Sequence, residues 1–143
     1  MYKYCRLFFV VLQFIIVLPV FAHSNAGSTS GLLHIRFGEN GLIVYDLKTG
    51  LINVYKNNVA VFSNAYTEVK VGNKLISSKD YNNRIYIKTA LSNGFGKGEK
   101  YTLKLTGPEL PEIDLAFYVY ANREYFLTET EVRGHNLRSN YIA

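Results

Sequence analysis

The sequence of 143 residues predicts an all-β protein, an antiparallel β-sandwich preceded by an N-terminal signal-peptide helix. Three observations favour this fold. Short runs rich in Val, Ile, Tyr, Leu and Thr alternate with turns that contain Gly and Asn. Several runs place apolar and polar residues on opposite faces with a period of two. After the first 22 residues, no stretch shows the spacing of an amphipathic helix. A closed barrel is the alternative architecture that the same pattern allows.

The expected strands follow one another from Leu33 to the end of the chain. Their connections carry turn residues, since Asn57-Asn58 tolerates left-handed backbone and Gly72-Asn73 suits a two-residue hairpin turn. The strands are expected at Leu33–Phe37, Leu42–Asp46, Ile52–Lys56, Val59–Phe62, Tyr66–Val71, Lys74–Ser78, Arg84–Ala90, Lys100–Thr106, Ile113–Tyr120, Tyr125–Val132 and Tyr141–Ala143.

Alternation within these strands indicates which side chains share a face. In Lys100–Thr106 the apolar side carries Tyr101, Leu103 and Leu105, opposite lysines and threonines. Around residue 86, Ile85 and Ile87 form the apolar side and oppose polar neighbours in the same way. One apolar and one polar face is typical of antiparallel sheets that pack on a shared core. We therefore expect both isoleucines to face that core.

Residues 1–22 have the layout of a secretory signal peptide. Lys3 and Arg6 precede an apolar run from Leu7 to Phe21, and Ala22 ends a stretch typical of signal cleavage. Ala26 is a second possible cleavage position. An uncleaved anchor is the structural alternative, but the run of about 15 residues is shorter than the roughly 20 that span a bilayer. We therefore expect an exported protein, periplasmic or extracellular, with no integral membrane span after cleavage.

Cleavage changes the chemistry that the chain can offer. Loss of Lys3 and Arg6 lowers the formal charge from +5 to +3, and loss of Cys5 removes the only thiol. Disulfides and Cys-based zinc sites are thereby excluded from the remaining part. The remaining basic residues are spread out, which argues against nucleic-acid binding. Residues 23–31 are small and polar and predict a flexible leader, and residues 32–143 predict one β-sandwich domain.

Catalytic patterns in the sequence are weak. The Gly-rich stretch Ser92–Glu99 is followed by an expected strand rather than the helix of a phosphate site, so it predicts a flexible hairpin loop. Glu129 and Glu131 should share one strand face about 7 Å apart. That separation overlaps the carboxylate pairs of inverting glycosidases, although water-wet strand faces often carry such pairs. His34 and His135 have no partner at metal-ligand spacing, and His34 is expected on the outer sheet face.

Tyrosines are numerous in the expected strands. Aromatic rings pack against the apolar side of sugar rings, although tyrosine is also a common strand residue. The rings that could meet a sugar are those of Tyr45, Tyr55, Tyr66, Tyr81, Tyr86, Tyr118 and Tyr120.

Several motifs of the C-terminal half resemble a known family. A Leu-Pro turn in Gly107–Glu112 precedes a long hairpin. The first strand of the hairpin ends in Phe117–Tyr120, and the second begins at Tyr125–Thr128. The chain then ends in Leu137-Arg138-Ser139-Asn140-Tyr141-Ile142-Ala143. This order resembles the N-terminal β-sandwich, a supersandwich-like domain, of secreted α-galactosidases (melibiases, similar to glycoside hydrolase family 36). Tyr45–Gly50 and Ser77–Arg84 resemble that family's opening hairpin and its Asp-Tyr-x-x-Arg stretch.

The resemblance implies a non-catalytic module. In the family, two aspartates on a following (β/α)8 barrel perform the chemistry, and no residue of this chain matches either of them. The implied protein is therefore a fragment truncated before its catalytic barrel, which would be its missing partner. We expect no catalytic residue, metal ion or cofactor in this chain, whereas a full-length relative would be an α-galactosidase-like glycoside hydrolase.

The most family-like polar and aromatic segments supply the candidate carbohydrate-binding residues. These are Tyr81, Arg84, Asn140 and Tyr141, in which Arg and Asn would hydrogen-bond sugar hydroxyls while Tyr stacks. A galactoside or plant polysaccharide is the expected ligand class. The alternative functions are a stand-alone secreted carbohydrate-binding or adhesion module, a small exported enzyme with a dispersed site, and an assembly protein of the cell envelope.

Overall fold

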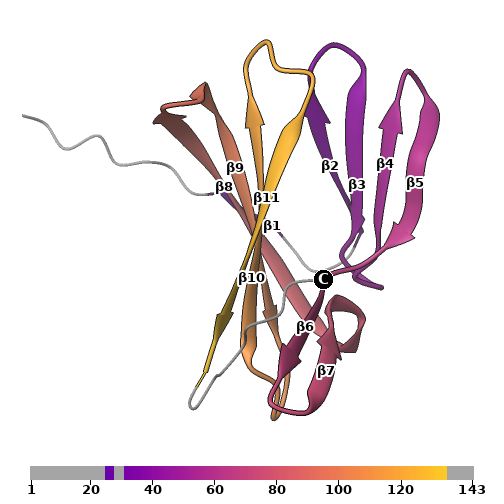
Figure 1. The fold of residues 1–143 in the computed structure, drawn as a ribbon, viewed down its shortest axis with the longest axis vertical. Coiled ribbons are helices and arrows are strands. Elements are labelled where there is room, and N and C mark those ends of the chain that lie inside the picture. Colours follow the sequence, from indigo (N-terminus) through magenta and orange to yellow (C-terminus); the bar gives the residue numbers. More distant parts are fainter. Residues whose placement is uncertain (1–24, 28–30, 135–143) are drawn as a thin grey trace, which may run out of the picture.

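A computed structural model describes residues 25–27 and 31–134 of the chain (Figure 1). The described part is all-β, with antiparallel strand pairing throughout, as the sequence predicts. The expected signal helix, the cleavage position Ala22 and the expected strand Tyr141–Ala143 lie outside the described residues, whereas Ala26 lies within them. His135, Asn140 and Tyr141 also lie outside the described residues.

The first large sheet is a four-stranded meander. It consists of β2 (Leu32–Phe37), β3 (Gly41–Asp46), β4 (Ile52–Lys56) and β5 (Val59–Ala65), in that order. Asn57 and Asn58 both have positive φ, 51° and 62°, in the turn between β4 and β5, which matches the turn expected there. The pairing of β5 with β4 is irregular, so β5 is a bulged edge strand.

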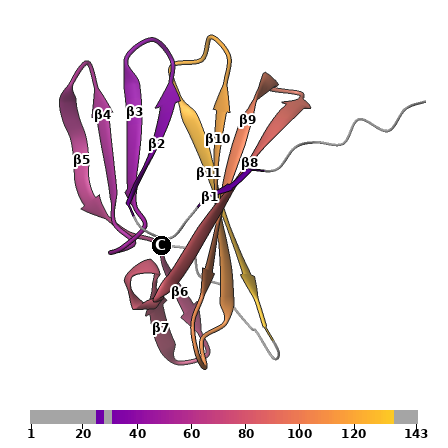
Figure 2. The ribbon, with the colours of Figure 1, turned by 180° about the vertical axis from the view of Figure 1, so that it is seen from behind.

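The second large sheet has five strands in the order β1-β8-β9-β10-β11. Each neighbouring pair is antiparallel, and the sheet faces the four-stranded sheet across the molecule (Figures 1 and 2). Its strands are β1 (Asn25–Gly27), β8 (Asn83–Asn93), β9 (Gly96–Thr106), β10 (Glu112–Tyr120) and β11 (Phe126–Arg133).

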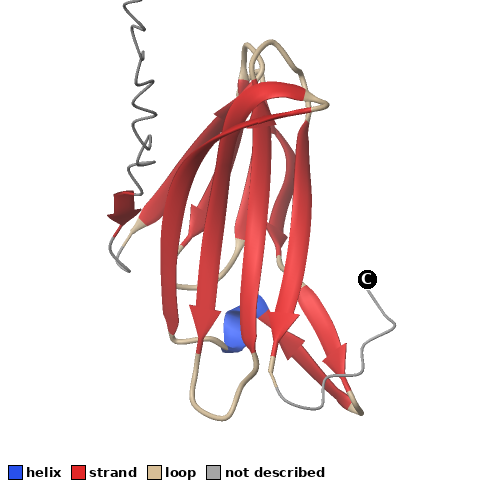
Figure 3. Cartoon of the chain, turned by 90° about the vertical axis from the view of Figure 1, so that its left-hand side faces the viewer, coloured by secondary structure: helices blue, strands red, loops and turns tan. Residues whose placement is uncertain are grey.

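A short ribbon lies below the four-stranded sheet in Figure 1. It pairs β6 (Glu68–Val71) with β7 (Lys74–Ser77), and a single helical turn, η1 (Ser78–Asp80), follows it (Figure 3). The sequence predicts a strand that continues through Ser78. The helical turn begins there instead, because Ser77 and Asp80 form a capping box.

The core lies between the two large sheets. Ile35 and Ile43 from one sheet and Leu105 and Ile113 from the other are all fully buried, and they belong to one apolar cluster. Phe37 of β2 meets Phe126 of β11 edge to face, with ring centroids 5.0 Å apart. Burial of each such side chain stabilises the fold by about 1.5–3 kcal/mol. The two sheets are therefore held together as one sandwich-like unit.

The expected alternation is confirmed in β9, but its use in β8 is wrong. Tyr101, Leu103 and Leu105 face the core. Arg84 pairs directly with Leu105 and is itself buried, with 2% of its surface exposed. Since paired residues point to the same face, Ile85 must point outward beside Lys104. In β8 the polar side of the pattern therefore faces the core.

Two further elements differ from the expectation. Asn25–Gly27, inside the predicted leader, forms strand β1 against β8. Asn93 pairs with Gly96, so the expected long loop is a tight turn between two longer strands. Neither small polar residues nor glycines are typical of strands, which is why the sequence favoured loops at both places.

Candidate functional site: the charged outer face of the five-stranded sheet

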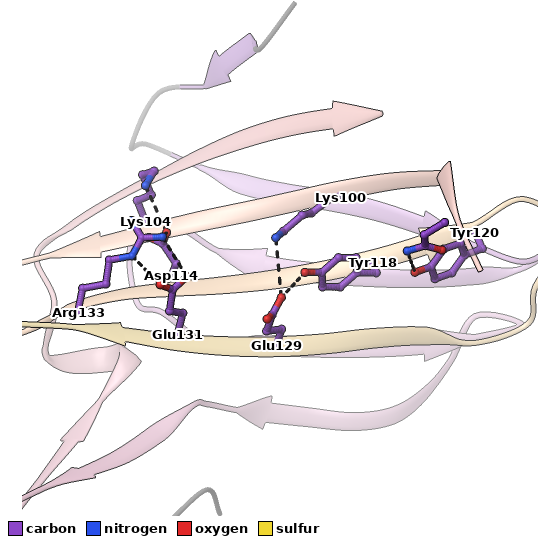
Figure 4. Close-up of polar contacts among 9 residues, drawn as sticks. Lys100, Lys104, Asp114, Tyr118, Tyr120, Glu129, Glu131 and Arg133 are labelled. Atoms are coloured by element: carbon purple, nitrogen blue, oxygen red, sulfur yellow. Dashed lines mark hydrogen bonds and ion pairs between the residues drawn. The ribbon is translucent and has the colours of Figure 1, made fainter. Parts of the chain in front are cut away.

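Seven polar side chains gather on the outer face of β9, β10 and β11 (Figure 4). We call them the outer-face network: Lys100, Lys104, Asp114, Tyr118, Glu129, Glu131 and Arg133. Strand register brings them together, because Asp114 pairs with Lys104 on one side and with Glu131 on the other. Residues that alternate along neighbouring strands thus form one continuous surface.

Asp114 is the centre of one half of this network. Its carboxylate lies 3.3 Å from the Lys104 ammonium and 3.0 Å from the Arg133 guanidinium, and only 11% of its side chain is exposed. Arg133 also donates two hydrogen bonds, each 2.9 Å long, to the carboxylate of Glu131. A buried carboxylate held by two cations contributes more than an ordinary surface ion pair.

Glu129 is the centre of the other half. It accepts a hydrogen bond from the Tyr118 hydroxyl and lies 3.8 Å from the Lys100 ammonium. That ammonium also lies 4.9 Å from the centre of the Tyr118 ring. Hydrogen bonding to Tyr118 and the nearby carboxylates raise the pKa of Lys100 above its usual value, although partial burial opposes the rise.

A shallow hollow of about 260 Å³ separates the two halves. Small or uncharged side chains line its floor, namely Ile87, Thr102 and Ala116. Ala116 carries only a methyl group between the two ion-paired clusters, and this leaves the space open. The hollow therefore has a polar rim and a small, largely apolar floor.

The charges of the network limit the chemistry it can perform. Hydrogen bonds from Arg133 hold the pKa of Glu131 below its usual range. A general acid needs the opposite shift, which apolar surroundings or a second carboxylate would supply. Each of the three carboxylates instead faces a cation. Glu129 and Glu131 do share one face as expected, but Glu131 stays ionised and is a poor proton donor.

The structure places Tyr81 inside the protein. Its side chain is 2% exposed, and its hydroxyl donates a 2.6 Å hydrogen bond to the carbonyl of Pro111. Burial, with a smaller contribution from Asp80, raises the pKa of Tyr81 to about 12. Tyr81 directly follows η1, and its hydrogen bond therefore ties the end of η1 to the turn before β10.

Arg84 is equally buried, and its guanidinium is surrounded by backbone carbonyls. It donates to Leu47, Lys48, Ser78 and Lys79 at distances between 2.8 and 3.4 Å. Arg84 and Tyr81 therefore have partners within the fold and little surface to offer a ligand. Asn140 and Tyr141 are outside the described residues, so carbohydrate binding by these four residues stays a prediction.

Sequence reasoning pointed to Glu129 and Glu131 but not to the network that they join, in which Asp114 pairs with Lys104 and Arg133. Asp114, Tyr118 and Arg133 occupy alternate positions of their strands, so the signal was present in the period of two. Which strands are neighbours, and in what register, decides the pairing, and a single sequence does not give that information. His34 is exposed on β2, as expected.

Residues 25–27 and 31–134 include no group of three His, Cys, Asp or Glu side chains that could hold a metal ion. Among the same residues, no helix is long and apolar enough to cross a membrane. Comparison of the chain with protein-family models, curated proteins and solved structures found no match.

Proposed function

We propose that the chain is the non-catalytic N-terminal β-sandwich module of an exported α-galactosidase-like glycoside hydrolase that acts in carbohydrate metabolism. The order of its motifs supports this function, from the Tyr45–Gly50 hairpin through the Leu-Pro turn at Gly107–Glu112. The antiparallel two-sheet fold is compatible with such a supersandwich-like module. In this proposal the enzyme's paired aspartates lie on a catalytic barrel that these 143 residues do not include.

The observation that carries the proposal is the exposed edge of the four-stranded sheet. Among the strands that the structure describes, β5 pairs only with β4, and its exposed apolar residues Val59, Val61 and Phe62 are 68%, 61% and 42% accessible. The strand contains no charged residue. Edge strands of independent domains are commonly protected by charges or proline, so an uncharged apolar edge suits a module completed by a neighbouring part of its enzyme.

The first test measures turnover. Residues 23–143 are purified and assayed on an aryl α-galactoside, with a buffer blank and a second round of purification. We expect no hydrolysis above the blank, because the carboxylates of the outer-face network are paired with cations. Hydrolysis that survives repurification would contradict the non-catalytic function.

The second test examines the reading frame past the codon for Ala143. An open frame that encodes an aspartate-bearing barrel, in phase or one base out of phase, is the expected result. An unrelated sequence in every frame would argue against the proposal. If a barrel is encoded, Val61→Lys should lower the folded yield of the extended chain while leaving the isolated module unaffected, because Val61 is exposed in the module and the proposal has the barrel cover it.

A stand-alone carbohydrate-binding or adhesion module is the second candidate. It is favoured by half-buried tyrosines on the outer faces of both sheets, Tyr55 on β4 and Tyr118 on β10. This function predicts saturable binding of galactosides or plant polysaccharides without any partner protein. Isothermal titration of residues 23–143 with such ligands measures it directly.

A further inference from the structure

A second hollow, on the outer face of the four-stranded sheet, differs from the outer-face network in one decisive respect. It measures about 340 Å³, and its lining includes Arg36, Tyr55, Asn57 and Asn58. In the part of the chain that the structure describes, none of these four side chains makes a hydrogen bond or an ion pair with another residue. Their donors and acceptors are therefore free for a ligand, whereas those of the outer-face network already have partners.

Strand register builds the base of this hollow. Leu42 of β3 pairs with Arg36 of β2 on one side and with Tyr55 of β4 on the other. The three side chains form one row across the sheet on its outer face. Leu42 is half-buried between them, so the row presents a guanidinium, an apolar surface and an aromatic ring in sequence.

Two hairpin turns form the wall of the hollow. The β2–β3 turn contributes Asn40 and the β4–β5 turn contributes Asn57 and Asn58, both at the upper end of the sheet in Figure 1. The backbone N–H of Asn57 donates a 3.0 Å hydrogen bond to the backbone carbonyl of Asn40, which ties one turn to the other. The amide side chains are thus held beside the Tyr55 row by a fixed backbone.

The chemistry of these groups selects a neutral, hydroxyl-rich ligand. An aromatic ring packs against the C–H face of a sugar, and amide groups both donate to and accept from hydroxyls. Arg36 and Glu39, both on the lining, carry opposite charges, so the hollow has no net field for a phosphate or a polyanion. The volume lies at the small end of ligand sites, which matches one or two sugar rings.

We propose that this Tyr55 hollow is a subsite for a neutral saccharide, with Tyr55 as the stacking platform and Asn57, Asn58 and Arg36 as hydrogen-bonding groups. The proposal rests on the carbohydrate-binding function given above as the second candidate. It does not depend on membership of an α-galactosidase-like enzyme, because the turnover and reading-frame tests address that question separately.

The test uses residues 23–143 and two soluble probes, a neutral galactomannan and the polyanion polygalacturonate. Affinity gel electrophoresis and isothermal titration measure binding. We expect saturable binding of galactomannan and at least tenfold weaker binding of polygalacturonate. Absence of saturable galactomannan binding, or equal binding of both probes, would overturn the proposal.

Variants locate the site. Tyr55→Ala should weaken galactomannan binding about tenfold, since it removes the stacking platform. Asn58→Gly should weaken binding severalfold without disturbing the fold, because glycine adopts the 62° φ of this position readily while lacking the amide. Phe95→Ala, in the β8–β9 turn of the other sheet, is the matched control, because this exposed aromatic ring lies outside the hollow, and it should bind like the unmodified chain.

The outcomes separate a local site from a loss of folding. Thermal unfolding followed by circular dichroism shows whether each variant is folded. If Tyr55→Ala unfolds, Asn58→Gly still decides the question. Unchanged binding by folded Asn58→Gly and Tyr55→Ala would remove the hollow as a sugar site, as would a larger effect of Phe95→Ala.

Discussion

Arg84 donates two hydrogen bonds to one backbone oxygen, the carbonyl of Ser78, from Nε at 3.2 Å and from Nη2 at 2.8 Å. Its remaining donors reach the carbonyls of Leu47, Lys48 and Lys79. The five N–H groups of a guanidinium are thereby fully used. One buried side chain joins β8, the β3–β4 turn and η1, which links the two large sheets and the ribbon at their common end.

Arg84→Lys should destabilise the protein by about 3 kcal/mol or more. A lysine ammonium has three donors on a flexible stem and is more strongly hydrated, so several buried carbonyls would lose their partners. Urea unfolding measures the change in the free energy of unfolding. Arg123→Lys is the matched control, because Arg123 is exposed and its substitution should cost less than about 0.5 kcal/mol. Equal effects would contradict a structural role for Arg84.

Gly50→Ala tests how closely the β3–β4 turn approaches Ser78. A Cβ at Gly50 would lie 2.4 Å from the Ser78 carbonyl oxygen, and Gly50 has a φ of +78°. Gly72 has a similar φ, +61°, but a Cβ there would meet nothing within 4 Å. Gly72→Ala should therefore cost about 1 kcal/mol from backbone strain alone, and Gly50→Ala clearly more. The difference between their unfolding midpoints reports the steric contact, and equal midpoints would rule it out.

Tyr45→Phe and Tyr81→Phe make the same chemical change with opposite expected results. The Tyr45 hydroxyl is buried without a hydrogen-bond partner in the described structure, and burial raises its pKa to about 12 while Arg84 opposes the rise. Its removal should leave stability unchanged or increase it by about 1 kcal/mol. Tyr81→Phe leaves the Pro111 carbonyl without its donor and should cost about 1–2 kcal/mol. Thermal unfolding of both variants measures the contrast, and a larger loss for Tyr45→Phe would contradict this assignment.

Much of the fold could be predicted because successive residues of a β-strand point to opposite faces, so apolar and polar residues alternate in the sequence. Leu103 and Leu105 alternate with Thr102, Lys104 and Thr106, and the observed strand β9 buries both leucines. The period does not say which side faces the core. In β8 the buried side carries Arg84, whose cost of burial is offset by carbonyls 36 and 37 residues away in the chain. Such partners come from the tertiary fold, so Ile85 and Ile87 were assigned to the wrong side.

The candidate site was harder to predict than the fold for the same reason. Glu129 and Glu131 could be placed on one face from their spacing. The partners of Glu129, which are Lys100 and Tyr118, lie on two neighbouring strands and are set by the strand register, which no local pattern determines. Tyr55 could be named from the sequence as a ring that could pack against a sugar. Its position beside two hairpin turns is fixed only by the folded meander.

The ion pair between Lys88 and Glu99 predicts a specific sensitivity to acid. The two groups lie 2.8 Å apart, and Tyr101 donates a second 2.8 Å hydrogen bond to Glu99. Burial alone would raise the pKa of Glu99, but these hydrogen bonds outweigh it and leave the pKa below the usual 4.5. A carboxyl with a depressed folded-state pKa stabilises the fold fully above its unfolded pKa, and this contribution is lost as the pH falls through the folded value. Since both side chains are more than 40% exposed, the contribution is on the order of 0.5 kcal/mol.

Glu99→Gln should therefore reduce stability slightly at pH 7, and the difference should be smaller at pH 3, because that pH lies below the usual pKa of 4.5 and the contribution declines there. Urea unfolding midpoints at the two pH values measure this convergence. Glu109→Gln is the control, because Glu109 is exposed in a turn and has no ion pair among residues 31–134, so its curve should follow the unmodified chain at both pH values. An undiminished difference between Glu99→Gln and the unmodified chain at pH 3 would show that the glutamate acts through packing rather than charge. The same ion pair also stabilises the fold at alkaline pH, because hydrogen bonds to Glu99 and Tyr101 raise the pKa of Lys88 above 10.5. That contribution to stability is lost only as the pH rises past the raised pKa.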